Sequence, residues 1–153
     1  MAAAVKRAIL FRERNQSAGT PMARAFIGPF DETMALLYEA RDYVRHQEPL
    51  DRRAVSPLQA VMISRESMRV TARLTEVMAW LLLRRAVADG EISLEHARAP
   101  EHRLSRHPVH LDQDGARAMP RRLRNLLERS STLYGRVARL DEATSAPDSR
   151  SAC

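Results

Sequence analysis

Apolar positions recur with helical spacing in three long stretches of the chain, so the sequence predicts three helices. The first runs from about residue 29 to residue 46, with an apolar stripe formed by Phe30, Met34, Leu37 and Val44. We expect it to end before Pro49, because the residue that precedes a proline is pushed out of the helical region. The third helix is expected over residues 120–143. Its apolar seam, favourable for an antiparallel partner helix, consists of Leu123, Leu126, Ser130, Leu133, Val137 and Leu140.

The second predicted helix has clear signals at both ends. Ser56 is a favourable N-cap, Pro57 suits the first helical position, and Gly90 suits a left-handed stop after Asp89. A helix with these ends has about 32 residues and a length of about 48 Å, which is long for a small domain. Its predicted apolar stripe comprises Leu58, Val61, Met62, Met68, Ala72, Thr75, Met78 or Ala79, Leu82 and Ala86.

The last turns of this second helix are apolar on every side. The residues from Ala79 to Leu83 are consecutive, and consecutive residues step about 100° around a helix. Burial on several sides predicts a second subunit in a chain of 153 residues. Tryptophan at such a place fits either the core of one protomer or an anchor at a subunit interface. The candidate dimer or partner interface comprises Trp80, Leu81, Leu83, Arg73 and Arg84.

The sequence therefore predicts an all-α fold: an antiparallel three-helix bundle protomer with a long central helix, which dimerises. Residues 29–143 form the helical domain. Residues 1–28 are expected to be a mobile basic N-terminal arm, and residues 144–153 have the composition of a disordered tail. Between the second and third helices, Ser93 can cap a short helix, and residues 105–119 are expected to form an irregular loop.

Charge is distributed unevenly between the predicted helices. Residues 31–51 contain six acidic residues and two arginines, net −4, whereas residues 117–143 contain seven arginines and three acidic residues, net +4. The first and third helices should therefore attract each other. The whole chain has a net charge of +6, which raises a small Arg-rich nucleic-acid-binding regulatory protein as the alternative function. No helix-turn-helix unit and no stacking aromatic residues accompany these arginines, so nucleic acid is the less favoured partner.

The sequence offers little catalytic chemistry. It has no Gly-x-Ser-x-Gly motif and no glycine-rich phosphate loop, and its single cysteine is the terminal Cys153. Loop histidines His102, His107 and His110 could ligate a metal, but solvated histidines are the favoured interpretation because their spacing matches no established site. We therefore expect no enzyme, no catalytic, cofactor or metal site, and no cofactor. The absence of a long apolar run and of paired cysteines favours a cytoplasmic location.

The stretch RLTEVMAWLLLRRAVADGEI, residues 73–92, resembles the central motif of the RcdA family (regulator of CtrA degradation). Residues 34–43 (MALLYEARDY) resemble the first-helix motif of that family, and residues 119–130 with 136–141 resemble its last helix. The resemblance implies a dimeric helical bundle in the bacterial cytoplasm. It also implies a non-enzymatic adaptor or scaffold that helps to deliver substrates, of the transcriptional regulator class, to the ClpXP protease together with its other adaptors. It assigns no catalytic residue.

Overall fold

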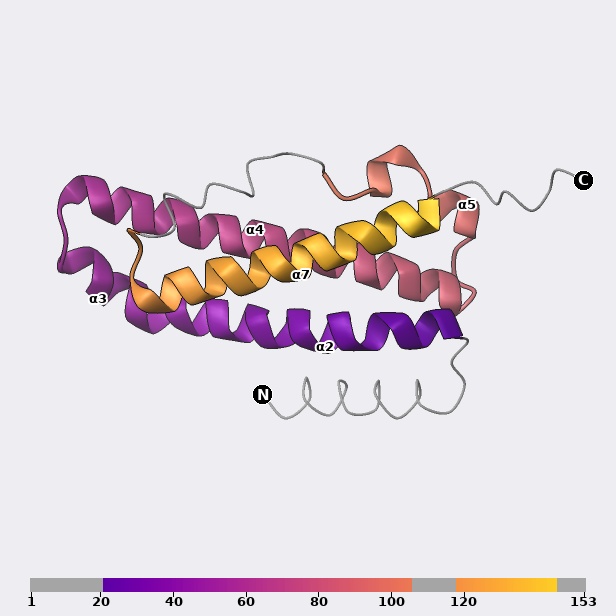
Figure 1. Ribbon diagram of the computed structural model, residues 1–153, viewed down its shortest axis with the longest axis horizontal. Helices are drawn as coiled ribbons and strands as arrows, with labels where there is room; N and C mark the ends of the chain where they lie inside the picture. Colours follow the sequence, from indigo (N-terminus) through magenta and orange to yellow (C-terminus); the bar gives the residue numbers. More distant parts are fainter. Residues whose placement is uncertain (1–20, 106–117, 146–153) are drawn as a thin grey trace, which may run out of the picture.

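The computed structural model describes residues 21–105 and 118–145, and this part of the chain forms helices and no strands. Three long helices make up a bundle (Figure 1): α2 (Pro21–Asp42), α4 (Pro57–Ala88) and α7 (Arg121–Ser145). The all-α class and the helical bundle predicted from the sequence are confirmed. Shorter helical elements join them: η1 (Tyr43–Gln47), α3 (Glu48–Arg53), α5 (Leu94–Ala97) and η2 (Pro100–His102).

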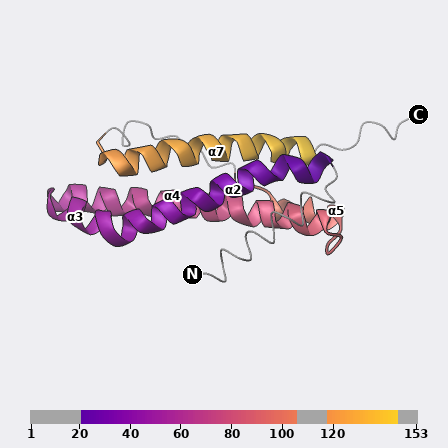
Figure 2. The same cartoon turned by 90° about the horizontal axis from the view of Figure 1, so that it is seen from below.

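Helix α2 runs against both other long helices, and α4 and α7 run in the same direction (Figures 1 and 2). The side chains of Arg73 and Trp80 on α4 bond to residues of α7 that lie 57 and 61 positions further along, a nearly constant offset typical of parallel helices. Between α2 and α7 the separation falls from 104 residues at Glu32 to 80 at Asp42, which is antiparallel. Helix α7 thus has its predicted antiparallel partner in α2, while its pairing with α4 is parallel because the chain returns along the bundle before α7.

The predicted ends of α4 are confirmed. The Ser56 hydroxyl accepts a hydrogen bond from the backbone N–H of Gln59, and the Gln59 side chain accepts one from the backbone N–H of Ser56, which forms a capping box. At the other end Gly90 adopts a φ of 75°, a conformation that favours glycine, and the N–H of Glu91 bonds back to the carbonyl of Ala86 at 2.8 Å. This capping fixes a helix of 32 residues that spans the bundle.

Helix α2 begins earlier than the sequence predicted. It starts at Pro21 and carries Pro29 in its interior, so residues 21–28 belong to the helix and not to an N-terminal arm. An interior proline removes one backbone hydrogen bond, and the cost is offset here by packing. Phe26, which is buried, lies edge-on to Trp80 of α4 with ring centroids 5.6 Å apart. Tertiary contact therefore outweighs the local helix-breaking signal.

The chain also continues as a helix beyond the predicted end before Pro49. A proline ring clashes with the carbonyl four residues earlier, which here belongs to Arg45. The structure avoids the clash with a wider π-turn over Tyr43–Gln47, in which the N–H of Glu48 bonds to the carbonyl of Tyr43, five residues back. Helix α3 follows directly, with Pro49 in its first turn, and the helical run ends only at Arg53.

The core lies along the line where the three long helices meet. The predicted seam of α7 is confirmed, because its leucines and Val137 are almost wholly covered and only Leu140 is partly exposed. Helix α2 contributes Phe26, Leu36 and Ala40 to the core, and η1 contributes Tyr43. Helix α4 contributes Ile63, Val70, Leu74, Val77, Trp80 and Leu81.

The connection after α4 matches its prediction as far as the structure describes it. The Ser93 hydroxyl caps α5 by accepting a hydrogen bond from the N–H of His96. Of the tail predicted over residues 144–153, Thr144 and Ser145 instead form the last residues of α7. Most of the predicted loop over residues 105–119, the arm up to residue 20 and the tail from residue 146 lie outside the described residues. Among the described helices, none combines the length and the apolar character needed to cross a membrane.

Candidate functional site

Helix α4 carries two apolar faces, and only one of them is used inside the protomer. The inner face is buried against α2 and α7. The outer face leaves large side chains exposed: Leu58 at 72%, Val61 at 65%, Met68 at 72% and Leu82 at 48%. The apolar stripe predicted from the sequence lies largely on this outer face, so it is not the stripe that packs into the core.

The buried polar residues of α4 explain why the predicted apolar stripe differs from the buried one. Glu66, Ser67, Arg73 and Arg84 are all on the inner face and less than a tenth exposed. They interrupt the apolar stripe on the inner face. In the sequence, the apolar spacing on the outer face is therefore the more regular of the two. A helix with a regular apolar stripe toward solvent is typical of a contact surface for another protein.

The apolar stripe predicted for the first helix also lies partly outside the core. Of its predicted stripe, Phe30, Met34 and Leu37 are half-buried, and Val44 is 41% exposed. These residues lie at the edge of the bundle, next to the outer face of α4. Tyr38 adds a further large side chain there, 48% exposed.

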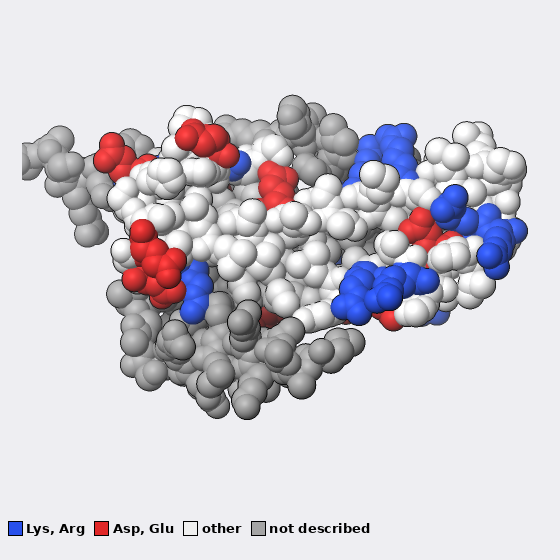
Figure 3. Space-filling view, turned by 180° about the vertical axis from the view of Figure 1, so that it is seen from behind, with Lys and Arg blue, Asp and Glu red and all other residues white. Residues whose placement is uncertain are grey.

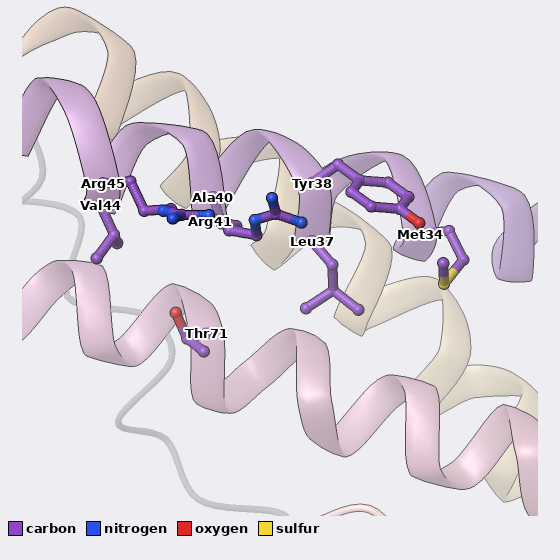
Figure 4. Close-up of a pocket in the computed structure, with 8 residues that line it drawn as sticks. All are labelled: Met34, Leu37, Tyr38, Ala40, Arg41, Val44, Arg45 and Thr71. Atoms are coloured by element: carbon purple, nitrogen blue, oxygen red, sulfur yellow. The ribbon is translucent and has the colours of Figure 1, made fainter. Parts of the chain in front are cut away.

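A groove lies between α2 and α4. It consists of two hollows of about 460 and 510 Å³ that share Val44 and Thr71. Figure 4 shows Leu37 and Val44 directed from α2 toward the ribbon of α4, where Thr71 lies. Its lining residues are Met34, Leu37, Tyr38, Ala40, Arg41, Val44, Arg45 and Glu48 from the α2 side, and Ser64, Ser67, Met68, Thr71 and Ala72 from α4. We call this the α2/α4 groove.

The charges around the α2/α4 groove are mostly positive. Figure 3, which looks at the bundle from the side opposite to Figure 1, shows an uncharged band with most of the visible arginines toward one end, where some acidic atoms lie among them, and other acidic residues toward the opposite end. Arg41 and Arg45 are exposed at the groove edge, and neither makes an ion pair with a carboxylate in the described part of the chain. The one carboxylate that lines the groove, Glu48, is buried and accepts a hydrogen bond from the hydroxyl of Ser64 at 2.8 Å.

The predicted interface residues around Trp80 lie mainly inside the protomer. Trp80, Leu81, Arg73 and Arg84 are at most 4% exposed, and Leu83 is half-buried. The indole N–H of Trp80 donates to a carboxylate oxygen of Asp141 at 2.9 Å. The alternative that the sequence left open for Trp80, a place in the core of one protomer, is therefore the one that the structure supports.

Asp141 holds together the end of the bundle where α4 and α7 meet. Its carboxylate accepts from Trp80 and pairs with Arg84 at 3.4 Å and with Arg103 at 3.4 Å. The guanidinium of Arg84 also lies over the Trp80 ring, 4.9 Å from its centroid. Burial lowers the pKa of Arg84, and the charge of Asp141 opposes that effect. The sequence signal for Asp141 was its place beside Leu140 at the end of the α7 seam, where an acidic residue is unexpected.

Arg73 has a comparable structural role in the middle of the bundle. Its guanidinium donates to the carbonyl of Leu127 at 3.1 Å and to the hydroxyl of Ser130 at 2.8 Å. Burial lowers the pKa of Arg73. Both bonds cross from α4 to α7, so Arg73 fixes the parallel register of these helices and is not presented to a partner.

Three of the six arginines of α7 pair with acidic residues of α2. The predicted attraction between the first and third helices is confirmed by three ion pairs: Arg122 with Asp42 at 3.2 Å, Arg129 with Glu39 at 2.6 Å, and Arg136 with Glu32. A duplex would have to displace these pairs to use the same arginines for phosphate contacts. This arrangement weighs against the nucleic-acid alternative.

The structure describes only part of the candidate metal cluster. His102 lies against His96, with ring centroids 4.9 Å apart. His107 and His110 fall outside the described residues. Within residues 21–105 and 118–145, no three histidine, cysteine or acidic side chains come together in a way that could hold a metal ion.

These features define the class of protein: a helical bundle whose most distinctive surface is an exposed apolar face suited to protein contact. The comparisons with known proteins agree with the helical fold. Residues 20–152 match the family described as "Protein of unknown function (DUF1465)". The crystal structure of RcdA from Caulobacter crescentus CB15 superimposes with a TM-score of 0.65 at 34% sequence identity, covering 83% of this chain and 93% of that one. No curated protein matches the sequence.

The chain therefore belongs to the DUF1465 family and is RcdA-like in sequence and fold. The resemblance inferred from residues 34–43, 73–92 and 119–141 is confirmed.

Proposed function

We propose that this protein is a non-enzymatic adaptor or scaffold in regulated proteolysis. In this role it binds protein substrates, of the transcriptional regulator class, and helps to deliver them to the ClpXP protease together with the other adaptors of that protease. The likeness to RcdA over most of both chains supports the proposal. The observation that carries it is the outer apolar face of α4, with Leu58, Val61 and Met68 each at least 65% exposed.

The physical argument rests on the free energy of that face. Burying apolar surface stabilises a complex by about 25 cal/mol per Å², so exposed Met and Leu side chains give a partner a substantial contact. A lone exposed leucine needs no explanation, but three large exposed apolar side chains on one face of a helix do. A contact of this kind needs no catalytic residue, cofactor or metal, and it operates in the cytoplasm where the protease acts.

We further propose that the protein is a homodimer, with its interface near the stretch first singled out in the sequence. Trp80, Leu81, Arg73 and Arg84 face inward, so the accessible part of that stretch is Leu83, which is half-buried, and its neighbour Leu82, which is 48% exposed. Exposed Ala79, one turn earlier, permits close approach of a second helix.

Leu82→Asp should therefore convert the dimer to a monomer in sedimentation equilibrium at micromolar concentration, without loss of helical signal. A wild-type protein that is monomeric under these conditions contradicts the dimer.

Affinity capture from the native cytoplasm tests the adaptor role. The tagged full-length protein should recover ClpX, its other adaptors or a protein that ClpXP degrades, identified by mass spectrometry. Met68→Asp is the informative variant, because Met68 is 72% exposed and its replacement changes the surface without disturbing the core. Arg139→Glu, at an exposed position of α7, is the matched control. The proposal fails if wild-type protein and Met68→Asp recover the same proteins and none of them belongs to the proteolytic system.

A further inference from the structure

The α2/α4 groove has the shape of an unfilled position in a helical bundle. Helices α2 and α4 pack against each other, and α7 occupies one side of the pair (Figures 1 and 2). The opposite side has apolar side chains from both helices, among them Leu37, Val44 and Met68, but no described helix covers it. From Met34 on α2 through η1 to Glu48 at the start of α3, the groove follows about 21 Å of helix, which is the length of a four-turn helix.

The floor of the groove permits a helix to approach closely. Thr71 and Ala72 are the small residues of α4 at its centre, and larger side chains, Leu37 and Met68, flank them. Alternating small and large residues form grooves and ridges on a helix surface. The ridges of another helix pack into these grooves. Recognition of this type uses apolar anchors at positions i, i+3, i+4 and i+7 of the incoming helix.

The way α7 docks shows how charge selects the helix on each side of α2. On the α7 side α2 presents Glu32, Glu39 and Asp42, and the docked helix is basic, with each carboxylate paired to an arginine. The groove side has Arg41 of α2 and Arg45 of η1, which have no carboxylate partner in the described part of the chain. The lining residues from α4 are uncharged. By the same rule of complementarity, the groove selects a helix that carries acidic residues beside its apolar stripe.

Neither the segment before α2 nor a second copy of the chain satisfies this rule. The segment before α2 carries Lys6, Arg7, Arg12 and Arg14 against a single acidic residue, Glu13. A second copy centred on the groove would bring Arg41 and Arg45 close to the same arginines of its partner, because a two-fold interface places like surface against like surface. Like charges in such an arrangement oppose association.

We propose that the α2/α4 groove binds an amphipathic helix of a partner protein, with an apolar stripe against Leu37, Val44 and Met68 and with acidic residues that pair with Arg41 and Arg45. This deepens the proposed function, on which it rests, by stating the chemistry of the segment that the adaptor recognises. The groove is separate from the proposed dimer contact, because Leu82 lies 14 residues beyond Met68, about 21 Å along α4.

A pair of synthetic peptides tests the proposal directly. One is a four-turn amphipathic helix with leucine at i, i+3, i+4 and i+7 and glutamate beside the stripe. The other has lysine in place of each glutamate. Fluorescence anisotropy with the full-length protein should give a dissociation constant at least about tenfold lower for the acidic peptide, which corresponds to about 1.4 kcal/mol. The preference should decrease as salt is added.

Three variants place the binding in the groove. Arg41→Glu with Arg45→Glu should reverse the preference between the two peptides, and Met68→Asp should weaken both. Arg139→Glu, a single charge reversal on the other side of the bundle, should leave the preference as it is. All four positions are exposed, so circular dichroism should show the same melting curve for each variant as for wild type.

Several outcomes would overturn the proposal: no binding of either peptide, equal binding of both, or an acidic preference that survives the Arg41→Glu and Arg45→Glu changes. A change in the oligomeric mass of Met68→Asp alone would show that a second copy occupies the groove, which also overturns it. Since none of these measurements uses the protease, the groove and the adaptor role can fail independently.

Discussion

Replacing Asp141 with alanine should destabilise the protein far more than an ordinary surface ion pair would. Asp141 is 3% exposed and provides the carboxylate for Arg84, which is 4% exposed. Removing one partner of a buried ion pair leaves the other charge uncompensated, at a cost of about 3–5 kcal/mol. The indole N–H of Trp80 loses its acceptor at the same time, but the two losses belong to one network and do not simply add.

The assay uses the only tryptophan of the chain as its probe. Urea unfolding followed by Trp80 fluorescence and by circular dichroism should show a lower free energy of unfolding for Asp141→Ala by about 3–5 kcal/mol. For a protein of this size the melting temperature should fall by about 6–20 °C, at roughly 2–4 °C per kcal/mol. The native fluorescence should also change, because the carboxylate lies 2.9 Å from the indole nitrogen.

Two further variants separate the buried network from a general effect of removing a carboxylate. Asp89→Ala also removes a partner from an arginine of α4, Arg85 at 3.0 Å, but Asp89 is 43% exposed, so the loss should be below about 1 kcal/mol. Replacing both buried partners, Arg84→Met with Asp141→Leu, should recover most of the stability. The reasoning is refuted if Asp141→Ala costs no more than Asp89→Ala.

Two other predictions concern pH and salt. Burial raises the pKa of Tyr43 above its ordinary value of 10.0, and the hydrogen bond to Asp51 is the second cause. The tyrosine therefore ionises at a lower pH in the unfolded protein than in the folded one. The free energy of unfolding should be constant below about pH 9 and should fall above pH 10. Tyr43→Phe should reduce this alkaline slope, with Tyr38→Phe as the exposed control; an unchanged slope refutes the assignment. Glu39→Gln breaks the pair with Arg129 on the bundle surface and should lower the free energy of unfolding by less than about 1 kcal/mol. The difference from wild type should shrink in high salt. Urea titrations at two salt concentrations measure both effects. A cost that is independent of salt contradicts the surface pairing.

The sequence predicted those elements whose signals are local. Ser56 and Gly90 delimit α4 through hydrogen bonds within a few residues, and the α7 seam was clear because Leu123, Leu126 and Leu133 have no apolar competitor on the opposite face. The ends of α2 could not be predicted from the residues around them. Pro29 and Pro49 both signal a helix end, and what overrides them is the packing of Phe26 on Trp80 and a π-turn before Pro49.

The candidate site was predicted in part. The apolar last turns of α4, residues 79–83, predicted a second subunit, and that stays a prediction; periodicity could not tell which of the two apolar stripes of α4 faces inward. Arg73 and Arg84 look like surface residues in the sequence, and only their partners on α7, Ser130 and Asp141, show that they are interior. The groove itself depends on two helices that meet in space, and no spacing within one helix encodes it.

Reconstituted degradation tests the central claim most directly. Purified ClpXP is incubated with a substrate recovered by the protein, and the initial rate of substrate loss is measured without the protein, with it, and with Met68→Asp in its place. We predict that the wild-type protein accelerates degradation and that Met68→Asp, folded but altered on the outer face of α4, does so to a lesser extent. Equal rates with and without the wild-type protein, for every substrate that it binds, would contradict the account.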